Sequence, residues 1–429
     1  MADAEVEATL PRSSGAPRAL SSGAMTRAAR RPDERTEAFP LGARVTLEQL
    51  DRDPHPALAR LRAHEPVSWV PALGGWVVTR RDLALQVMRD TATFTVDDPR
   101  FSTARVIGAS MLSVDGAEHK RHRDPFARPF RLDAVRERFT GTVRAETDRL
   151  IDAFAPAGEV ELRRGLAGPL AAAMMTFALG LEDAGVGEVL RWYDAIVASV
   201  TEITAGRPPT EDGTRSYAAL RGALDVALRA DPGSSLVAAA AGRAGALAPD
   251  RVASNAAVLL FGGIETTEGM IANAVAHLLA APAALGAVEA EPGLLPNAVE
   301  ESLRLEPAAA VVDRYATRDM SLGGAAIGER ELVVVSIAAA NRDPAVFPDP
   351  DTFDVRRTDA RLHIAFAAGP HVCLGMHLAR LEAHTAVRRL LDRLPGLRLA
   401  PGAGVAPRGL VFRKPPELRL RWTVPALPG

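Results

Sequence analysis

Apolar residues recur at the spacing of an α-helix along most of the chain beyond about residue 40. This pattern predicts helices over residues 56–64, 81–89, 116–126 and 375–393, with several more between residues 136 and 228. Strand patterns are short: residues 67–70 and 75–79 are expected to pair as a hairpin, and residues 332–337 to form another strand. Residues 97–110 and 343–354 are predicted loops, and no repeat of fixed period is visible. The pattern therefore predicts a mainly α chain with small β-sheets and one core.

The longest predicted helix runs from Asp250 to Ala281, with Asp250 as its N-cap and Pro282 as its stop. At 1.5 Å per residue it would span roughly 45–50 Å, the width of a large domain. Residues 256–261 are almost wholly apolar, so the middle of this helix should be buried on every side.

The first 40 residues show no helical or strand period and are rich in Ala, Arg, Ser and Gly. They are expected to form a disordered tail (residues 1–40) ahead of one large domain (residues 41–429). The arginines of this tail suggest a transit peptide, but the acidic residues among them argue against it.

Composition narrows the classes of function. Hydrophobic residues make up 47% of the 429 residues, enough for a large core. The formal charge of −2 gives no electrostatic reason to expect a nucleic-acid partner. No apolar run reaches the roughly 18–20 residues that span a bilayer, so we expect no membrane association and a cytoplasmic location. Cys373 is the only cysteine, which excludes an internal disulfide and cysteine-rich zinc or iron–sulfur sites.

Two glycines interrupt the apolar centre of the longest helix, and an acid and a hydroxyl follow them: Gly262, Gly263, Glu265 and Thr266. Each glycine inside a helix costs about 1 kcal/mol relative to alanine, so another body must approach closely or the helix must open. One interpretation is a kink in which Thr266 bonds to a carbonyl one turn earlier. The other is a groove where a flat ligand approaches and where protons are delivered. This segment alone favours neither.

Cys373 lies in a loop rich in Gly and Pro, directly before a predicted helix. Backbone N–H groups and the helix dipole favour a thiolate at such a position. A zinc site of His371, Cys373 and His377 lacks the paired-cysteine spacing of such sites. A thiolate as axial ligand of haem iron fits better, because one ligand suffices and glycines let the loop lie against a planar macrocycle.

Several motifs resemble those of the cytochrome P450 family. Phe366, Gly369, Cys373 and Gly375 resemble its cysteine-loop signature, and residues 262–266 resemble its central-helix motif. Glu301 and Arg304 are similar to its structural Glu–Arg pair, and residues 118–123 to the His-x-x-x-Arg helix of soluble bacterial members. The resemblance runs from about residue 45 to the C-terminus. It implies a cytochrome P450-like fold, mainly α with small β-sheets, in a single large domain.

The resemblance implies haem b as the cofactor and Cys373 as the ligand of its iron. The cationic partners that it implies for the two haem propionates are His119, Arg123, Arg314 and His371. The residues that it places against the cofactor are Gly262, Gly263, Thr266, Phe366 and Gly375.

Two positions depart from the family pattern. Ala367 stands where the family often has glycine. Thr352 stands where many members carry an arginine that completes a triad with the Glu–Arg pair. Either Arg356 or Arg357 takes that role, or the triad is weakened.

The implied activity is a monooxygenase reaction with O2, in which the Thr266 hydroxyl holds the oxygen or a water and Glu265 relays protons. Family position assigns the substrate to residues 100–112, 197–209, 257–266, 308–312 and 405–411. Their small apolar side chains suggest a moderately hydrophobic small organic molecule and a tailoring step of secondary metabolism. The alternative is that these segments only mirror an alanine-rich chain.

Electrons are expected from a ferredoxin and a ferredoxin reductase, because no flavin or nicotinamide domain is apparent. A basic stretch either docks an acidic ferredoxin or is an ordinary solvated face; it comprises Lys120, Arg121, Arg128 and Arg131. One rival function uses the same haem site for coupling, ring formation or peroxide-driven oxidation. Another is a non-catalytic haem or ligand carrier, against which the Glu265–Thr266 pair argues. A zinc-dependent hydrolase is the most remote.

Overall fold

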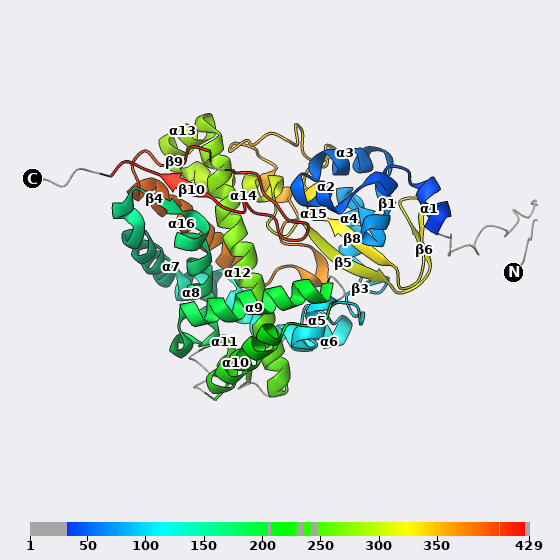
Figure 1. Ribbon diagram of the computed structural model, residues 1–429, viewed down its shortest axis with the longest axis horizontal. Helices are drawn as coiled ribbons and strands as arrows, with labels where there is room; N and C mark the ends of the chain where they lie inside the picture. Colours follow the sequence, from blue (N-terminus) through cyan, green and yellow to red (C-terminus); the bar gives the residue numbers. More distant parts are fainter. Residues whose placement is uncertain (1–31, 205–206, 230–234, 242–246, 403, 425–429) are drawn as a thin grey trace, which may run out of the picture.

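The computed structural model describes residues 32–204, 207–229, 235–241, 247–402 and 404–424. A β-rich part lies beside a larger helical part, and helix α12 runs through the middle of the helical part (Figure 1). The helices are α1 (Pro32–Ala38), α2 (Leu47–Arg52), α3 (His55–His64), α4 (Arg81–Arg89), α5 (Ser102–Ile107), α6 (Gly116–Ala127), α7 (Leu132–Phe154), α8 (Gly168–Leu179), α9 (Val186–Thr204), α10 (Glu211–Ala227), α11 (Leu236–Ala241), α12 (Pro249–Ala280), α13 (Pro282–Ala290), α14 (Leu295–Leu305), α15 (Ile337–Ala340) and α16 (Met376–Arg393).

The β-rich part is built on a five-stranded sheet in the order β1-β2-β8-β5-β3. Its strands are β1 (Val67–Val70), β2 (Gly75–Val78), β3 (Phe94–Thr95), β5 (Val311–Ala316) and β8 (Leu332–Ser336). Strands β2 and β8 pair in parallel, and the other pairs are antiparallel. Two small sheets complete the fold: β4 (Glu159–Glu161), β10 (Arg419–Arg421) and β9 (Arg398–Leu399), and β6 (Met320–Leu322) with β7 (Ala325–Ile327). The predicted mainly α chain with small sheets is confirmed.

The predicted hairpin is confirmed as β1 and β2, with Trp69 opposite Trp76. Gly74 between them has φ +61°, a left-handed conformation that glycine adopts without steric cost. Helices α3, α4 and α16 match their predicted segments to within one residue at each end.

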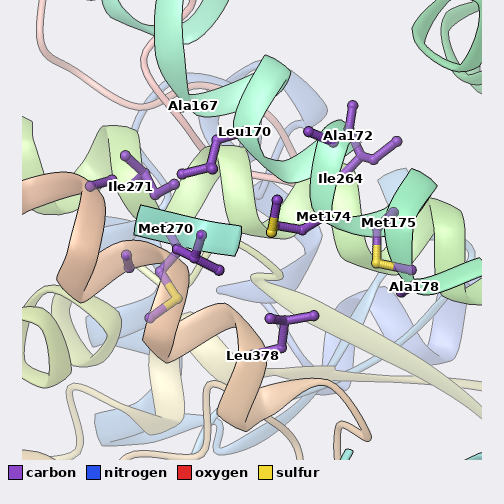
Figure 2. Packing of buried hydrophobic residues seen from close by; sticks show 14 of the residues in the cluster. Ala167, Leu170, Ala172, Met174, Met175, Ala178, Ile264, Met270, Ile271 and Leu378 are labelled. Atoms are coloured by element: carbon purple, nitrogen blue, oxygen red, sulfur yellow. The ribbon is translucent and has the colours of Figure 1, made fainter. Parts of the chain in front are cut away.

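Helix α12 is the predicted central helix, and it stays helical from Pro249 to Ala280. Its N-cap is Ala248 and not Asp250, because Pro249 occupies the first helical position, where its missing N–H costs nothing. The helix packs between α8 and α16, and Figure 2 shows Ile264, Met270 and Ile271 from α12 among side chains of both neighbours.

The two glycines of α12 have different surroundings. A Cβ at Gly263 would lie 2.3 Å from the Met175 sulfur of α8, so only glycine permits this close packing of the helices. A Cβ at Gly262 would meet nothing within 4 Å, because this glycine faces open space. Of the two explanations that the sequence offered, the close approach of another element holds at Gly263, and the helix opens at neither glycine.

Two predicted boundaries change. Residues 1–31 of the predicted tail lie outside the described residues, but residues 32–38 form α1. Arg35 is buried there, pairs with Glu331 at 2.5 Å and lies 4.7 Å from the Trp69 ring, so the described fold begins before residue 41. The predicted loop at residues 97–110 contains the short helix α5.

Within the described residues, no individual helix combines the length and apolar character needed to cross a membrane. Helices α12 and α13 meet that test only when taken together, and they are bent by 101° relative to each other.

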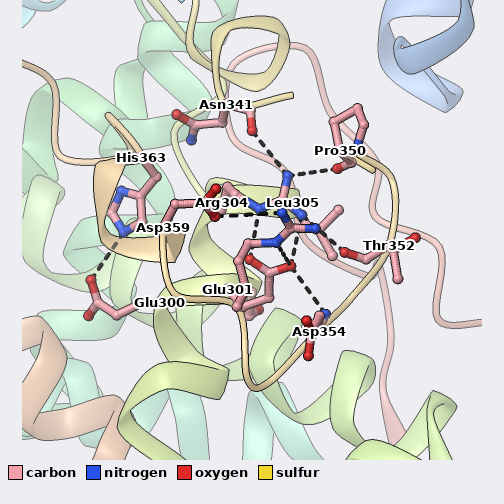
Figure 3. Close-up of polar contacts among 12 residues, drawn as sticks. Glu300, Glu301, Arg304, Leu305, Asn341, Pro350, Thr352, Asp354, Asp359 and His363 are labelled. Atoms are coloured by element: carbon pink, nitrogen blue, oxygen red, sulfur yellow. Dashed lines mark hydrogen bonds and ion pairs between the residues drawn. The ribbon is translucent and has the colours of Figure 1, made fainter. Parts of the chain in front are cut away.

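A buried ion-pair network ties α14 to the segment that precedes the cysteine loop (residues 366–375). The Arg304 guanidinium donates to both oxygens of Glu301, at 2.7 and 2.8 Å, and both side chains are fully buried. The same guanidinium donates to the carbonyls of Asn341, Pro350 and Thr352 (Figure 3).

Arg357 takes the role of the arginine that many family members carry at the position of Thr352. Its Nε donates to Glu301 Oε1 at 2.9 Å, whereas Arg356 pairs with Glu291 at the surface. Thr352 contributes only its backbone carbonyl, as an acceptor for Arg304. The question left open by the sequence is therefore settled: the triad is kept, with its second arginine five residues later.

Candidate active site

One cavity of about 250 Å³ lies between α12 and the cysteine loop. Eight of the predicted site residues line it: Arg123, Gly262, Gly263, Thr266, Phe366, His371, Cys373 and Gly375. Most of the other lining side chains are apolar, so the wall combines a few polar groups with a hydrophobic surface.

Backbone contacts fix the cysteine loop. The Cys373 N–H donates to the Phe366 carbonyl at 2.8 Å, and a short 3-10 turn at Gly369–His371 precedes the cysteine. Gly369 has φ +74°, and a Cβ there would lie 2.5 Å from the Met88 carbonyl oxygen. The loop therefore places Cys373 at the cavity, directly before α16.

Burial raises the pKa of the Cys373 thiol, while the Gly375 N–H and the charges of Arg123 and Arg380 oppose that rise. The groups that favour a thiolate are thus already present. Arg380 also lies 4.4 Å from the centre of the Phe366 ring, which fixes this aromatic side chain in the loop.

Ala367 has φ +60°. The family position that often carries glycine is therefore in a left-handed conformation, which is unfavourable for an L-residue with a side chain. The change from glycine is a strained one in this structure.

The four predicted propionate partners gather beside the cavity. The rings of His119 and His371 lie 4.3 Å apart, and His371 Nε2 donates to Asp115 Oδ1 at 2.7 Å. Arg123 donates to the Val372 carbonyl at 2.6 Å, and Arg314 Nη1 donates to the Asp313 carbonyl at 2.7 Å.

Two of these residues keep unused hydrogen-bonding atoms. His119 Nε2 and Arg314 Nε are buried and have no partner among the described residues. Burial, with the charges of His371 and Arg123, lowers the pKa of His119 to about 4. Unpaired buried donors beside two arginines are what a buried anion requires, so the residues present fit the carboxylates of haem b.

Thr266 and Glu265 point to different surroundings, since successive helical residues are rotated about the helix axis. Thr266 lines the cavity and donates to the Gly262 carbonyl at 2.5 Å, so the back-bond of the kink interpretation is present, although the helix remains unbroken. Glu265 does not line the cavity. It accepts a hydrogen bond from the Tyr193 hydroxyl and pairs with Lys414 at 2.7 Å.

Lys414 also pairs with Glu268, at 2.9 Å, and Arg163 pairs with Glu268 at 2.6 Å. The sequence analysis missed these partners, because Lys414 and Arg163 come from segments distant in sequence. The relay role of Glu265 stays a prediction, and the structure adds that Lys414 holds this carboxylate outside the cavity.

Three of the five predicted substrate segments reach the cavity. They supply Met111 and Leu112, then Val258 and Leu259, and then Ala308, Ala309 and Val312. No described residue of the segments 197–209 and 405–411 lines it, and residues 205–206 lie outside the described residues.

The sequence analysis missed Met175, Thr267 and Glu382 in the cavity wall. Helical spacing could have found Thr267, because it lies one turn beyond the predicted site residue Gly263 on α12, whereas no predicted residue of α16 pointed to Glu382.

Among the residues that the structure describes, no group of three or more His, Cys, Asp or Glu side chains is placed to hold a metal ion. The ligands of the zinc alternative, His371, Cys373 and His377, therefore do not converge.

Comparisons with known proteins agree on one family. The family model described as Cytochrome P450 matches residues 229–395. Nocardicin C N-oxygenase of Nocardia uniformis subsp. tsuyamanensis is 36% identical over 408 residues, which cover 90% of this chain and 99% of that protein. 6-Deoxyerythronolide B hydroxylase of Saccharopolyspora erythraea is 32% identical over 387 residues, covering 84% of this chain and 92% of that protein. The crystal structure of CalO2 is 30% identical with a TM-score of 0.79, covering 88% of this chain and 99% of that one.

Proposed function

The chain belongs to the cytochrome P450 family, and from this premise we propose that it is a tailoring enzyme of secondary metabolism that oxygenates a moderately hydrophobic small organic molecule. Members of the family are monooxygenases that use haem b with a cysteine thiolate ligand, O2, an organic substrate and a redox partner. One observation carries the proposal: Cys373 and Thr266 come from different elements and line the same cavity.

Haem b, when bound, supplies an iron that activates O2 with electron density from its thiolate ligand. Cys373 would hold this iron, and the backbone contacts of the cysteine loop fix the sulfur in place. His119 Nε2 and Arg314 Nε would donate hydrogen bonds to the carboxylates of the cofactor, and Arg123 would add a further positive charge. Gly262 leaves room for the cofactor on the cavity side of α12, because it has no side chain and nothing lies within 4 Å of the position of a Cβ there.

Thr266 would hold a water or the reacting oxygen. Its hydroxyl hydrogen is used by the Gly262 carbonyl, which leaves the oxygen lone pairs free to accept a hydrogen bond from the cavity. Glu265 would supply protons, but it must first leave Lys414, so this ion pair resists proton delivery along that route.

Replacing Thr266 with Ala tests this role through the product formed per electron consumed. We expect product per electron to fall and peroxide to rise, because oxygen that has taken up two electrons and two protons leaves as hydrogen peroxide before it can react with the substrate. Thr140→Ala on α7 is the matched control, since its hydroxyl makes the same kind of back-bond, to Arg136, and does not line the cavity. Unchanged coupling in Thr266→Ala would refute the role.

The substrate proposal is supported by the apolar side chains that the three contributing segments place in the cavity. Two relatives whose names give nocardicin C and 6-deoxyerythronolide B as substrates support a small organic molecule as the substrate, without bearing on its polarity. Titrating the holoenzyme with candidate compounds tests it, because a substrate that enters the cavity perturbs the haem absorption. We expect apolar compounds to give saturable shifts and small charged compounds to give none.

We further propose a ferredoxin, reduced by a ferredoxin reductase, as electron donor, and a cytoplasmic location, where a lone cysteine stays reduced. Lys120, Arg121, Arg128 and Arg131 are exposed, and Phe130 packs toward Gly375 of the cysteine loop. Reversing Arg128 and Arg131 to Glu should lower the rate of electron transfer and weaken its dependence on salt. An unchanged salt dependence would remove this docking site.

A further inference from the structure

One part of the cavity wall is held by polar side chains that have no part in the proposed function. This wall segment (residues 107–112) contributes Met111 and Leu112 to the cavity, and Leu112 is also 39% exposed. The segment therefore stands between the cavity and solvent. It follows α5 and precedes α6, and both helices lie beside the N-terminal part of α12 (Figure 1).

Two backbone groups of the wall segment are anchored to α12. The Ile107 carbonyl accepts a hydrogen bond from the Ser254 hydroxyl at 2.7 Å, and another from the Tyr217 hydroxyl of α10 at 2.9 Å. The Met111 N–H donates to Oδ1 of Asn255 at 2.7 Å. Asn255 is fully buried, so competing water does not weaken this bond.

The Asn255 amide is itself held in one orientation. Its Nδ2 donates to the Arg251 carbonyl at 2.7 Å and to His122 Nδ1 of α6 at 3.0 Å. Because His122 Nδ1 accepts, the ring proton lies on Nε2, which donates to Glu118 Oε1 at 3.2 Å. This arrangement fixes which way the amide points, and only this orientation presents an oxygen to the Met111 N–H.

We propose that Asn255, oriented by His122, is a positioning residue for substrate selection, because it fixes Met111 and Leu112 as a preformed wall for bulky ligands. A ligand that meets an ordered wall does not have to order it on binding, whereas a loose wall makes binding weaker. The inference rests on the proposed function for the nature of the ligand, but the anchor itself does not.

Binding of two azoles to the ferric holoenzyme tests this role without turnover. Imidazole and 4-phenylimidazole both ligate haem iron through a ring nitrogen and shift its absorption, but the phenyl group reaches further from the iron. Asn255→Leu keeps the size of the side chain and removes its polar atoms. We expect it to weaken 4-phenylimidazole binding about three- to ten-fold, and to change imidazole binding by less than about two-fold. An unchanged ratio of the two dissociation constants overturns the inference.

Asn297→Leu is the matched control. Asn297 also anchors a loop through backbone bonds, to the Val355 and Arg357 carbonyls, and none of these three residues lines the cavity. Both dissociation constants should stay as in the wild type. A change in their ratio equal to that of Asn255→Leu would show that the effect comes from a general loss of stability, and would contradict the positioning role.

Asn255→Asp is the conservative variant that should rescue the wall. It keeps an oxygen that accepts from the Met111 N–H, and its carboxylate can pair with a protonated His122. We expect this variant to keep most of the wild-type ratio. A ratio as low as that of Asn255→Leu would show that the bond to Met111 is not what matters.

His122→Leu removes the group that orients the amide. It should change the ratio in the same direction as Asn255→Leu, and the double variant should change it no more than Asn255→Leu alone, because both act on one anchor. Additive effects would show that His122 acts independently of Asn255 and would contradict its orienting role.

Hydrogen exchange of the unmodified holoenzyme gives a readout even if no variant folds. The Met111 amide should exchange slowly although the neighbouring Leu112 is 39% exposed, because buried Asn255 accepts its hydrogen bond. Rapid exchange at Met111 contradicts the inference.

The proposed function fails separately. A holoenzyme that gives the expected azole ratios but oxygenates no compound refutes the monooxygenase and leaves the positioning role standing. A holoenzyme that oxygenates a substrate, with an azole ratio that Asn255→Leu does not change, keeps the function and refutes the inference.

Discussion

The molecule has two buried polar regions, which differ in whether their polar groups have hydrogen-bond partners. In the paired cluster, Glu301, Arg304 and Arg357 satisfy one another, and Glu300 binds both Arg380 and His363. In the unpaired region, His119 Nε2 and Arg314 Nε beside the cavity and Glu382 Oε2 in its wall have no partners among the described residues.

From this difference we infer which buried polar groups serve the fold and which serve a ligand. A buried charge without a partner is unfavourable, so a folded chain keeps it only where something else will pair with it. The paired cluster positions the segment before the cysteine loop, and we propose that His119 and Arg314 of the unpaired region pair with the carboxylates of the cofactor. The predictions below test that division, beginning with the largest effect.

Removing one partner from the paired cluster should destabilise the fold most. Arg304→Ala leaves the Glu301 carboxylate buried with fewer partners, which typically costs about 3–5 kcal/mol in the free energy of unfolding. Arg356→Ala is the control, because the Arg356–Glu291 pair lies at the surface, where solvent screens it, and its loss should change the free energy of unfolding little. Denaturant unfolding of both variants measures this, and equal stabilities would erase the distinction between the two regions.

The second-largest effect expected is a loss of stability of the paired cluster at acidic pH. Burial opposes ionisation of Glu300, yet hydrogen bonds from Arg380 and His363 lower its pKa to about 2, against 4.5 for the free side chain. A carboxyl with a lowered pKa stabilises the fold above the unfolded value, and this contribution is lost as pH falls from about 4.5 to 2. On the order of 3 kcal/mol is involved, from 1.36 kcal/mol for each tenfold change.

The free energy of unfolding should therefore fall more steeply between pH 4.5 and 2 for the wild type than for Glu300→Gln. Glu382→Gln is the matched control from the unpaired region, because Glu382 is already protonated there and should leave the slope unchanged. Parallel curves for wild type and Glu300→Gln would contradict the assignment.

Replacing Arg314, whose Nε has no partner among the described residues, should not lower the stability of the fold as Arg304→Ala does. Arg314→Leu removes a buried guanidinium whose Nε is unused, so the apoprotein should keep its stability or gain slightly. Haem affinity should fall about ten- to hundred-fold, the loss of a charged hydrogen bond worth about 1.5–3 kcal/mol. Arg398→Leu, an exposed arginine on β9, controls for charge. Haem titration of the apoprotein measures this, and lost stability with unchanged affinity would place Arg314 in the structural class.

The smallest expected effect concerns the backbone of the cysteine loop. Ala367→Gly relieves a left-handed alanine, so the free energy of unfolding should rise by about 0.5 kcal/mol after the added freedom of the unfolded chain is subtracted. Ala368→Gly is the neighbouring control, because φ −149° is extended backbone and glycine should lower stability there by about 0.4–1 kcal/mol. Thermal unfolding distinguishes them, and a loss in both would show that Ala367 is not strained.

Periodicity predicted the elements well where one face is repeated over many residues. Helices α4 and α16 and the β1–β2 hairpin follow from local spacing alone. The start of the fold was placed too late, because α1 is held by a contact with Glu331, nearly three hundred residues away. A sequence pattern carries no trace of such a partner.

The site divides in the same way. The loop around Cys373 was predictable because its residues are consecutive and chemically unusual. The sequence left Arg356 and Arg357 as alternatives, and only the folded position of Glu301 chooses between them. Likewise, Glu265 and Thr266 are neighbours in sequence, but the turn of the helix separates them into an ion pair and a cavity wall.

The most direct test of the account is the absorption spectrum of the reduced protein under carbon monoxide. Purified protein, reconstituted with haemin if necessary, should bind haem and show a thiolate-type spectrum, and Cys373→Ser should lose that spectrum while keeping its fold. Protein that stays colourless, or a thiolate-type spectrum that survives in Cys373→Ser, would contradict it.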